Sequence, residues 1–307
     1  MSVASNHWHV GLVGYGEVGR ILAEDLRKEG VRVSAYDIKL DGPQARPLQD
    51  HAAGIGVTLA ASHADLAAAA DFIVSAVTAS QAVSVARACA GTVKHGAWFL
   101  DFNSASPGAK QRAAAVIDGA GARYVEGAVM TSVPPYRIKV PLLLGGAGAR
   151  ELAPLLVDLG FNAKVASDQL GVSSAVKMCR SIMIKGMEAM VIEAFTTARA
   201  YGVEDAVLAS LAETFPGINW EKQGAYFFQR VIEHGRRRAE EVREVAETVR
   251  EAGLTPWSAQ GTAERQAYIA DLADAGVFGT RGGGEFARSA DWRVEADRIL
   301  ASIKSNK

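Results

Sequence analysis

The first part of the chain alternates short apolar runs with longer amphipathic segments. The apolar runs are rich in β-branched and aromatic residues, and several are apolar throughout, which is typical of strands buried on both faces of a sheet. They cover residues 8–13, 32–36, 57–60, 72–77, 98–102, 123–126, 140–144 and 162–166. Segments of about helix length lie between them, for example residues 17–29, 81–90, 107–119 and 150–159. This strand–helix–strand repetition predicts an α/β domain with a doubly wound parallel sheet over residues 1–167.

After about residue 168 the strand pattern gives way to helical periodicity. Residues 171–201 contain no proline and only Gly186 as an internal helix breaker, which predicts one long helix. Residues 236–252 place apolar side chains at helical spacing, with arginine and glutamate four residues apart on the other side. We therefore expect the three arginines at 236–238 to lie on a solvated helix face. Residues 168–307 are predicted to form an all-α domain, with a site in the cleft between the two domains.

The composition is that of a globular protein with two domains. The chain has 307 residues, of which 49% are hydrophobic and 22% are charged. Lysine and arginine number 33 and aspartate and glutamate 34, so the formal net charge is -1. This balance argues against nucleic acid or an anionic membrane as a partner, because both bind concentrated positive charge. No apolar run is long enough to cross a bilayer, and the first residues lack a signal-peptide pattern.

The cysteines and histidines do not predict a disulfide framework or a metal site. Cys89 and Cys179 are too few for a disulfide framework, so a reducing, cytoplasmic location is the simplest expectation. We expect Cys179 to be a small buried side chain. His7 and His9 alternate as a metal-binding pair does, but no third ligand lies nearby in the sequence, and we predict no metal site. The glycine-rich segment at residues 279–285 is interpreted as a connector.

A glycine-rich loop lies between the first predicted strand and the first predicted helix. It reads Gly14-Tyr15-Gly16-Glu17-Val18-Gly19. In loops of this spacing the first glycine permits the tight turn, the second lets a pyrophosphate approach the backbone, and the third allows close helix–strand packing. The start of the helix supplies free N–H groups for the phosphates. We predict a Rossmann-type domain whose loop residues contact NAD or NADP.

An acidic residue at the end of the second strand refines the cofactor prediction. Asp37 lies 18 positions after Gly19, where a carboxylate accepts the ribose 2′-hydroxyl and repels a 2′-phosphate. This favours NAD over NADP. Lys39 offers a positive charge to a 2′-phosphate, so both cofactors stay open.

Two further loops follow strands of the sheet, at the edge where ligands of such sheets bind. One holds Val77 and Thr78, and the other contains Asn103 and Ser104 and leads to Ser106 and Pro107. Their short polar side chains suit a nicotinamide carboxamide or a substrate carboxylate. The residues before Pro107 also suit a helix cap, because serine at the cap and proline at the first helical position are preferred there.

These motifs together resemble the β-hydroxyacid dehydrogenases, a group that includes 3-hydroxyisobutyrate dehydrogenase and 6-phosphogluconate dehydrogenase. The resemblance rests on the glycine loop, the Asp-x-Asn-Ser-x-x-Pro segment from Asp101, the segment at residues 125–133, and Gly171-x-x-x-x-x-Lys177, all in the family's order. It implies a Rossmann domain, an all-α domain, a homodimer, and reversible oxidation of a 3-hydroxy acid. The arginine-rich segment near residue 236 resembles an uncharacterised C-terminal domain of a divergent branch.

The resemblance makes Lys177 the general acid/base. Hydride leaves the carbinol carbon only as the hydroxyl proton is removed, so a base must lie within hydrogen-bond reach of that oxygen. A lysine in an apolar, partly closed site has its pKa lowered toward the range such a role needs. We expect the neighbouring Met178, Ile182, Met183 and Met187 to form this apolar setting.

The substrate-recognition positions depart from the family pattern. Met130, Thr131 and Ser132 stand where the family has Ser-Gly-Gly, Ser181 stands in place of asparagine, Ser173 in place of glycine, and Glu240-Glu241 in place of Lys-Asp. We therefore expect a small substrate different from those of the well-known members, bound by Ser104, residues 130–132, Ser181 and Arg180. Arg180 and Lys185 suggest an acidic substrate, or else lie in solvent at the helix edge.

Two other functions compete with the dehydrogenase. An imine reductase has a similar architecture but usually carries another residue in place of Lys177. A sensor that binds NAD(H) without turnover needs no proton-transfer group, and the altered residues at 130–132 are compatible with it.

Overall fold

The structure is a computed structural model that describes residues 8–284, 286–287 and 289–305. The chain forms two compact units, Met1–Met178 and Cys179–Lys307. The boundary between them falls within helix α7 (Val172–Tyr201), which is the long helix predicted from the sequence.

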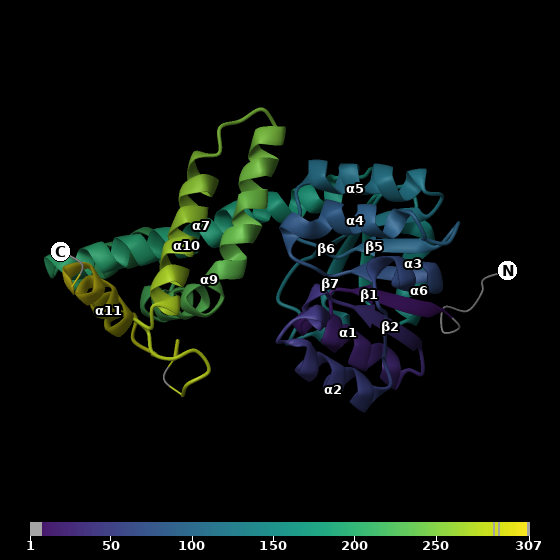
Figure 1. Cartoon of the computed structure of the whole chain (residues 1–307). Helices are drawn as coiled ribbons and strands as arrows, with labels where there is room; N and C mark the ends of the chain where they lie inside the picture. The colour runs from purple at the N-terminus through teal and green to yellow at the C-terminus, as the bar shows by residue number, and fades with distance from the viewer. Residues whose placement is uncertain (1–7, 285, 288, 306–307) are drawn as a thin grey trace. The chain divides into compact units, whose positions relative to one another are not determined.

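The described part of the first unit contains an eight-stranded sheet with the order β3-β2-β1-β4-β5-β6-β7-β8 (Figure 1). The strands are β1 (His9–Val13), β2 (Arg32–Tyr36), β3 (Thr58–Leu59), β4 (Phe72–Ser75), β5 (Trp98–Asp101), β6 (Arg123–Val129), β7 (Pro141–Gly145) and β8 (Asn162–Ser167). All of them coincide with apolar runs in the sequence. The predicted Rossmann-type architecture is confirmed.

One strand pair differs from the fully parallel sheet that was predicted. β7 pairs antiparallel with β6, while the other neighbouring strands are parallel. The reason is the connection at residues 130–140, which holds only the short 3-10 helix η4 (Arg137–Lys139). A parallel crossover needs a dozen or more residues, usually with a full helix.

Helices cover both faces of the sheet (Figure 1). They are α1 (Glu17–Lys28), α2 (Ala45–Ile55), α3 (His63–Ala69), α4 (Ala82–Ala90), α5 (Pro107–Gly119) and α6 (Ala149–Asp158), with the 3-10 helices η2 (Ile38–Asp41) and η3 (Ala79–Gln81). α1, α2 and α6 share one hydrophobic core, and α3, α4 and α5 share the other.

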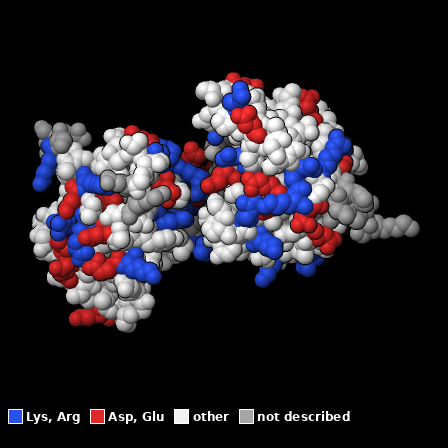
Figure 2. All heavy atoms as spheres, turned by 90° about the horizontal axis from the view of Figure 1, so that it is seen from below, with Lys and Arg blue, Asp and Glu red and all other residues white. Residues whose placement is uncertain are grey.

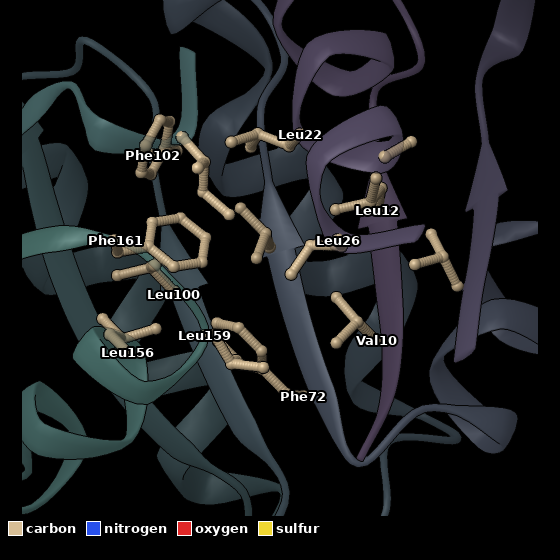
Figure 3. Packing of buried hydrophobic residues seen from close by; sticks show 14 of the residues in the cluster. Val10, Leu12, Leu22, Leu26, Phe72, Leu100, Phe102, Leu156, Leu159 and Phe161 are labelled. Carbon is tan, nitrogen blue, oxygen red and sulfur yellow. The ribbon is translucent and has the colours of Figure 1, made fainter. Parts of the chain in front are cut away.

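Alternate side chains of each central strand enter the two cores. Val10 and Leu12 of β1 pack with Leu22 and Leu26 of α1 in the first core (Figure 3). Val13 of the same strand belongs to the second core. Period-two alternation between two apolar cores explains why these strands are apolar throughout.

The second unit is helical in its described part. It combines the later residues of α7 with α8 (Glu204–Thr214), α9 (Trp220–Glu251), α10 (Trp257–Asp274) and α11 (Trp292–Ser305). Aromatic side chains dominate its core, where the ring of Phe195 lies against Trp292 at a centroid distance of 4.8 Å. Within the described ranges, no helix combines the length and apolar character needed to cross a membrane.

The arginines at 236–238 have three different environments. Arg237 forms the expected pair with Glu241 one turn on, at 2.7 Å. Arg236 instead reaches Asp271 and Asp274, each at 2.7 Å. The prediction of a solvated face is wrong for Arg238, which is buried and paired with Glu188 of α7.

Lys185 is also buried, and it pairs with Glu241 at 2.7 Å. Burial lowers the pKa of Lys185, and the neighbouring Glu241 carboxylate opposes this shift. Two buried cations and their carboxylate partners therefore link α7 to α9 inside the second unit. On the face seen in Figure 2, lysine and arginine side chains lie among aspartate and glutamate side chains, in keeping with the balanced composition.

Replacing Glu188 by alanine should strongly destabilise the second unit. The change leaves the Arg238 guanidinium buried without its carboxylate, which costs about 3–5 kcal/mol. Glu247→Ala is the control, because Glu247 pairs with Arg250 at the surface and such pairs contribute less than about 1 kcal/mol. Urea unfolding followed by circular dichroism measures both. Equal losses in the two variants would contradict the expectation.

Candidate dinucleotide and substrate site

The predicted site residues follow strands that end at one edge of the sheet. β1, β2, β4, β5 and β6 are parallel to one another, so their carboxyl ends lie together. The segments that follow these strands are residues 14–19, 37, 76–78, 103–106 and 130–132. Ligands of open α/β sheets bind at this edge.

Two glycines of the loop are required by the protein itself. Gly14 has a φ of +92°, and a Cβ there would lie 2.4 Å from the carbonyl oxygen of Ala76. A Cβ at Gly19 would lie 2.0 Å from the carbonyl oxygen of Gly14. The tight turn and the close helix packing expected from the spacing are both present.

The middle glycine has a different role. A Cβ at Gly16 would meet no protein atom within 4 Å, so this position faces open space. Gly16 is also the N-cap of α1 and makes no side-chain capping hydrogen bond. The residues present therefore fit a dinucleotide, with open space at Gly16 and the uncapped first turn of α1 available to a pyrophosphate. Glu17 is exposed in that turn, whereas Val18 packs against the core.

Tyr15 and Asp37 join the loop to its surroundings. The Tyr15 side chain is fully buried, and its hydroxyl lies 2.9 Å from Nδ1 of His51. Burial raises the pKa of Tyr15 to about 12, so the phenol stays protonated near neutral pH. The Tyr15 backbone N–H donates to Asp37 at 2.8 Å, and the N–H of Lys39 donates to the other carboxylate oxygen at 2.9 Å. These bonds hold the Asp37 carboxylate beside the glycine loop.

Asn103 ties the two neighbouring polar loops together. Its side-chain oxygen accepts the N–H of Val77 at 2.7 Å, and its amide donates to Ser75 at 2.9 Å. Thr78 is exposed next to this contact. Ser106 accepts the N–H of Ala109 as the N-cap of α5, so the helix-capping interpretation is confirmed at that residue.

Lys177 and Ser104 meet in the structure. The Lys177 amine donates to the Ser104 hydroxyl at 2.5 Å, which joins the second turn of α7 to the loop after β5. Met178 is buried beside it, as expected. Met183 is not part of an apolar setting, because 64% of it is exposed.

Other predicted substrate residues are placed as follows. The Met130 N–H donates to the carbonyl of Pro141 at 2.9 Å, while Thr131 is exposed and Ser132 is half-buried. Arg180 is exposed and Ser181 is buried, both on α7 beyond Lys177.

Three expectations need correction or restriction. Lys185 neither lies at a solvated helix edge nor has an unpaired charge to offer a substrate, because Glu241 neutralises it in the protein interior. Cys179 is exposed on α7 and not buried. His7 and Glu285 lie outside the described residues, and no cluster of potential metal ligands occurs in the part that is described.

Two buried carboxylates support the site and were missed by sequence reasoning. Asp101 accepts hydrogen bonds from Lys110 at 2.8 Å and from Tyr124 at 2.7 Å. Glu126 accepts hydrogen bonds from the first residues of α7. A charged residue within an otherwise apolar strand was the available signal, because a buried charge needs donors around it.

The fold and the glycine loop define a Rossmann-type dinucleotide-binding protein. Residues 9–146 match the family described as the NAD binding domain of 6-phosphogluconate dehydrogenase, and residues 198–269 match a domain of unknown function. The chain thus combines a domain similar to the NAD binding domain of 6-phosphogluconate dehydrogenase with a C-terminal domain of unknown function, and its curated relatives include 3-hydroxyisobutyrate dehydrogenases. The family resemblance noted in the sequence is thereby confirmed.

Individual relatives agree with this assignment. The solved structure of a conserved hypothetical protein from Sinorhizobium meliloti 1021 is 36% identical, with a TM-score of 0.72 over 94% of this chain and 96% of that one. An uncharacterised 28.5 kDa protein from Methanothermus fervidus is 28% identical over 80% of this chain and 93% of its own length. Mitochondrial 3-hydroxyisobutyrate dehydrogenase from Drosophila melanogaster is 25% identical over 73% of this chain and 68% of its own length.

Alanine substitutions at Gly16 and Gly19 should affect different properties: the first should weaken NADH binding, and the second should lower the stability of the protein. Gly16→Ala places a methyl group in open space, so the protein should keep its stability while NADH affinity falls on the order of tenfold or more. Gly19→Ala drives a methyl group into the Gly14 carbonyl and should cost about 1–3 kcal/mol of stability. Thermal unfolding and NADH fluorescence titration separate the two effects. An unchanged NADH affinity in Gly16→Ala would contradict the assigned role.

Proposed function

We propose that the protein is an NAD(P)-dependent oxidoreductase that interconverts a small 3-hydroxy acid and its oxo form, with Lys177 as general acid/base. The observation that carries the proposal is the 2.5 Å contact between the Lys177 amine and the Ser104 hydroxyl, which follows β5 at the same sheet edge as the glycine loop that fits a dinucleotide. The match of residues 9–146 to an NAD binding domain and the similarity to 3-hydroxyisobutyrate dehydrogenases support the reaction class.

The chain's own groups supply the proton chemistry. A nicotinamide cofactor, when bound, would supply the hydride-transfer chemistry. In the oxidative direction, the neutral Lys177 amine takes the hydroxyl proton as the carbon–hydrogen bond breaks toward the cofactor. In the reductive direction, the protonated amine returns that proton to the carbonyl oxygen. Ser104 lies within hydrogen-bond distance of the same amine and orients both the amine and a substrate oxygen.

The substrate is proposed to be a small anion. Arg180 is exposed on α7 close in sequence to Lys177, and it is the candidate for binding the negative charge. The Met130 N–H is already bonded to Pro141, so a carboxylate held by the loop after β6 would depend on Thr131 and Ser132. Ser181 is buried one turn after Lys177 and would shape the site.

NAD is proposed as the preferred cofactor. The Asp37 carboxylate is held beside the glycine loop by the N–H groups of Tyr15 and Lys39. A fixed carboxylate there accepts hydrogen bonds from a ribose 2′-hydroxyl and repels a 2′-phosphate. Asn103, Val77 and Thr78 are proposed to line the nicotinamide side.

Lys177→Met should strongly reduce turnover without affecting cofactor binding. Loss of the proton-transfer group is expected to reduce kcat by about 100- to 10,000-fold, while the Kd for NADH stays unchanged. A panel of 3-hydroxy acids is assayed with NAD and with NADP, and NAD should give the higher kcat/KM. Lys164→Met is the matched control, because Lys164 is exposed on β8 away from the contact with Ser104.

The same panel includes imines, since their turnover without any hydroxy acid turnover would replace the dehydrogenase by an imine reductase. Cofactor binding with no turnover of either class would favour a sensor. Full activity in Lys177→Met would remove the acid/base assignment.

We also propose that the chain forms a homodimer through α7. Val176, Met183 and Met190 are exposed and follow one another at intervals of seven residues, so they form one stripe along the helix, with Ile184 beside it. Large exposed apolar side chains in a contiguous stripe are typical of a protein interface. A second copy of the helix offers a matching stripe.

Charged substitutions in this stripe should produce monomers. Met183→Glu and Met190→Glu would bury unpaired carboxylates in the proposed interface, and the expected mass by light scattering is that of one chain. Ile303→Glu is the control, because Ile303 is exposed on α11 outside the stripe. A monomeric wild-type protein, or a dimer unaffected by either substitution, would exclude this interface.

A further inference from the structure

Glu126 has an unusual position for a carboxylate. It lies within β6, is fully buried, and is in register with Asp101 of β5 on one side and Gly145 of β7 on the other. A buried carboxylate is stable only where donors surround it.

The donors of Glu126 come from the start of α7. One carboxylate oxygen accepts the N–H of Gly171 at 2.9 Å and the N–H of Ser173 at 3.0 Å. The other oxygen accepts the Ser174 hydroxyl at 2.7 Å. The first N–H groups of a helix have no partner inside the helix, and negative charge at that end is favourable. Glu126 therefore supplies the cap that the residues of α7 do not supply themselves.

Two glycines make room for this arrangement. A Cβ at Gly145 would lie 2.3 Å from a carboxylate oxygen of Glu126 and 2.7 Å from the Ser173 hydroxyl. Gly171 has a φ of +96°, which turns the chain into the helix beside the carboxylate. Side chains at either glycine would displace the start of α7.

The carboxylate of Asp101, on the neighbouring strand, fixes the loop that carries Ser104. Asp101 accepts the backbone N–H of Asn103 at 2.9 Å, next to Ser104, and also binds the buried amine of Lys110. Adjacent strands thus present two buried carboxylates in register. One fixes the loop that carries Ser104, and the other fixes the helix that carries Lys177.

We propose that Glu126 is a positioning residue whose buried carboxylate fixes the start of α7 and thereby holds the Lys177 amine against Ser104. The effect on catalysis rests on the proposed function, whereas the effect on the position of the amine does not. A displacement of about 1 Å in a reacting group is enough to lower a rate on the order of 100-fold.

Glu126→Gln is the most direct variant. It keeps the size of the side chain but removes the negative charge that is favourable at the start of a helix, and it replaces the oxygen that accepts the Ser174 hydroxyl by an NH2 donor. We expect kcat to fall on the order of 100-fold while KM for the dinucleotide stays unchanged. Ser174→Ala removes one of the three hydrogen bonds and should cause a smaller change in the same direction.

A second experiment measures the chemical reactivity of the Lys177 amine and does not depend on enzymatic turnover. The full chain is treated with an amine-acylating reagent over a series of pH values, and modification of Lys177 is compared by mass spectrometry with that of the exposed Lys164. In Glu126→Gln the Lys177 amine should react faster relative to Lys164, because its contact with Ser104 is lost. Asn219→Ala is the matched control: it removes the side-chain cap of α9 and should leave the Lys177 profile unchanged.

The outcomes separate the two proposals. Identical Lys177 profiles in Glu126→Gln and in the wild type would overturn the positioning role, even where turnover is lost. Absence of wild-type turnover with a shifted Lys177 profile would refute the proposed function and support the positioning role. If Glu126→Gln does not fold, the Ser174→Ala profile decides, and an unchanged profile there overturns the proposal.

Discussion

Two buried carboxylates in the sheet must each be surrounded by hydrogen-bond donors, and this requirement fixes the segments that carry Ser104 and Lys177. Asp101 at the end of β5 and Glu126 in the middle of β6 are fully buried, so their charges are stable only with protein donors. Those donors come from elsewhere in the sequence: Lys110 and Tyr124 for Asp101, and the start of α7 for Glu126. The ion pair and hydrogen bonds thereby lock two distant segments onto the sheet. Burial raises the pKa of Tyr124 and the neighbouring Asp101 charge raises it further, so the phenol remains a donor.

The cofactor side of the fold could be predicted because its constraints are local. The apolar runs marked the strands, since each run fills two cores through period-two alternation. Gly14 and Gly19 are required by backbone atoms within the same turn or the neighbouring strand, so their spacing alone indicates the loop. Asp37 follows the second strand directly and contacts that loop.

Long-range pairing explains what the sequence did not reveal. Spacing within one helix anticipated the contact of Arg237 with Glu241, but Arg238 finds its partner on α7 and Arg236 finds its partners on α10. Lys185 is buried for the same reason, because its partner lies on another helix. α7 is apolar on several sides, so periodicity could not decide that Met183 and Cys179 face outward. The antiparallel β7, in contrast, had a local signal in the short connection at residues 130–140.

The buried carboxylates that hold the backbone and the exposed residues proposed to bind substrate are different residues, which matters for how the substrate of such a site can change. Asp101 and Glu126 lie below the surface and fix the backbone beneath Ser104 and Lys177, whereas Thr131 and Arg180 are exposed. The donors of both carboxylates lie outside residues 130–132, so a substitution there leaves these hydrogen bonds in place. If Lys177 is the acid/base as proposed, a chain can therefore depart from the Ser-Gly-Gly element implied by the resemblance and retain the geometry needed for proton transfer.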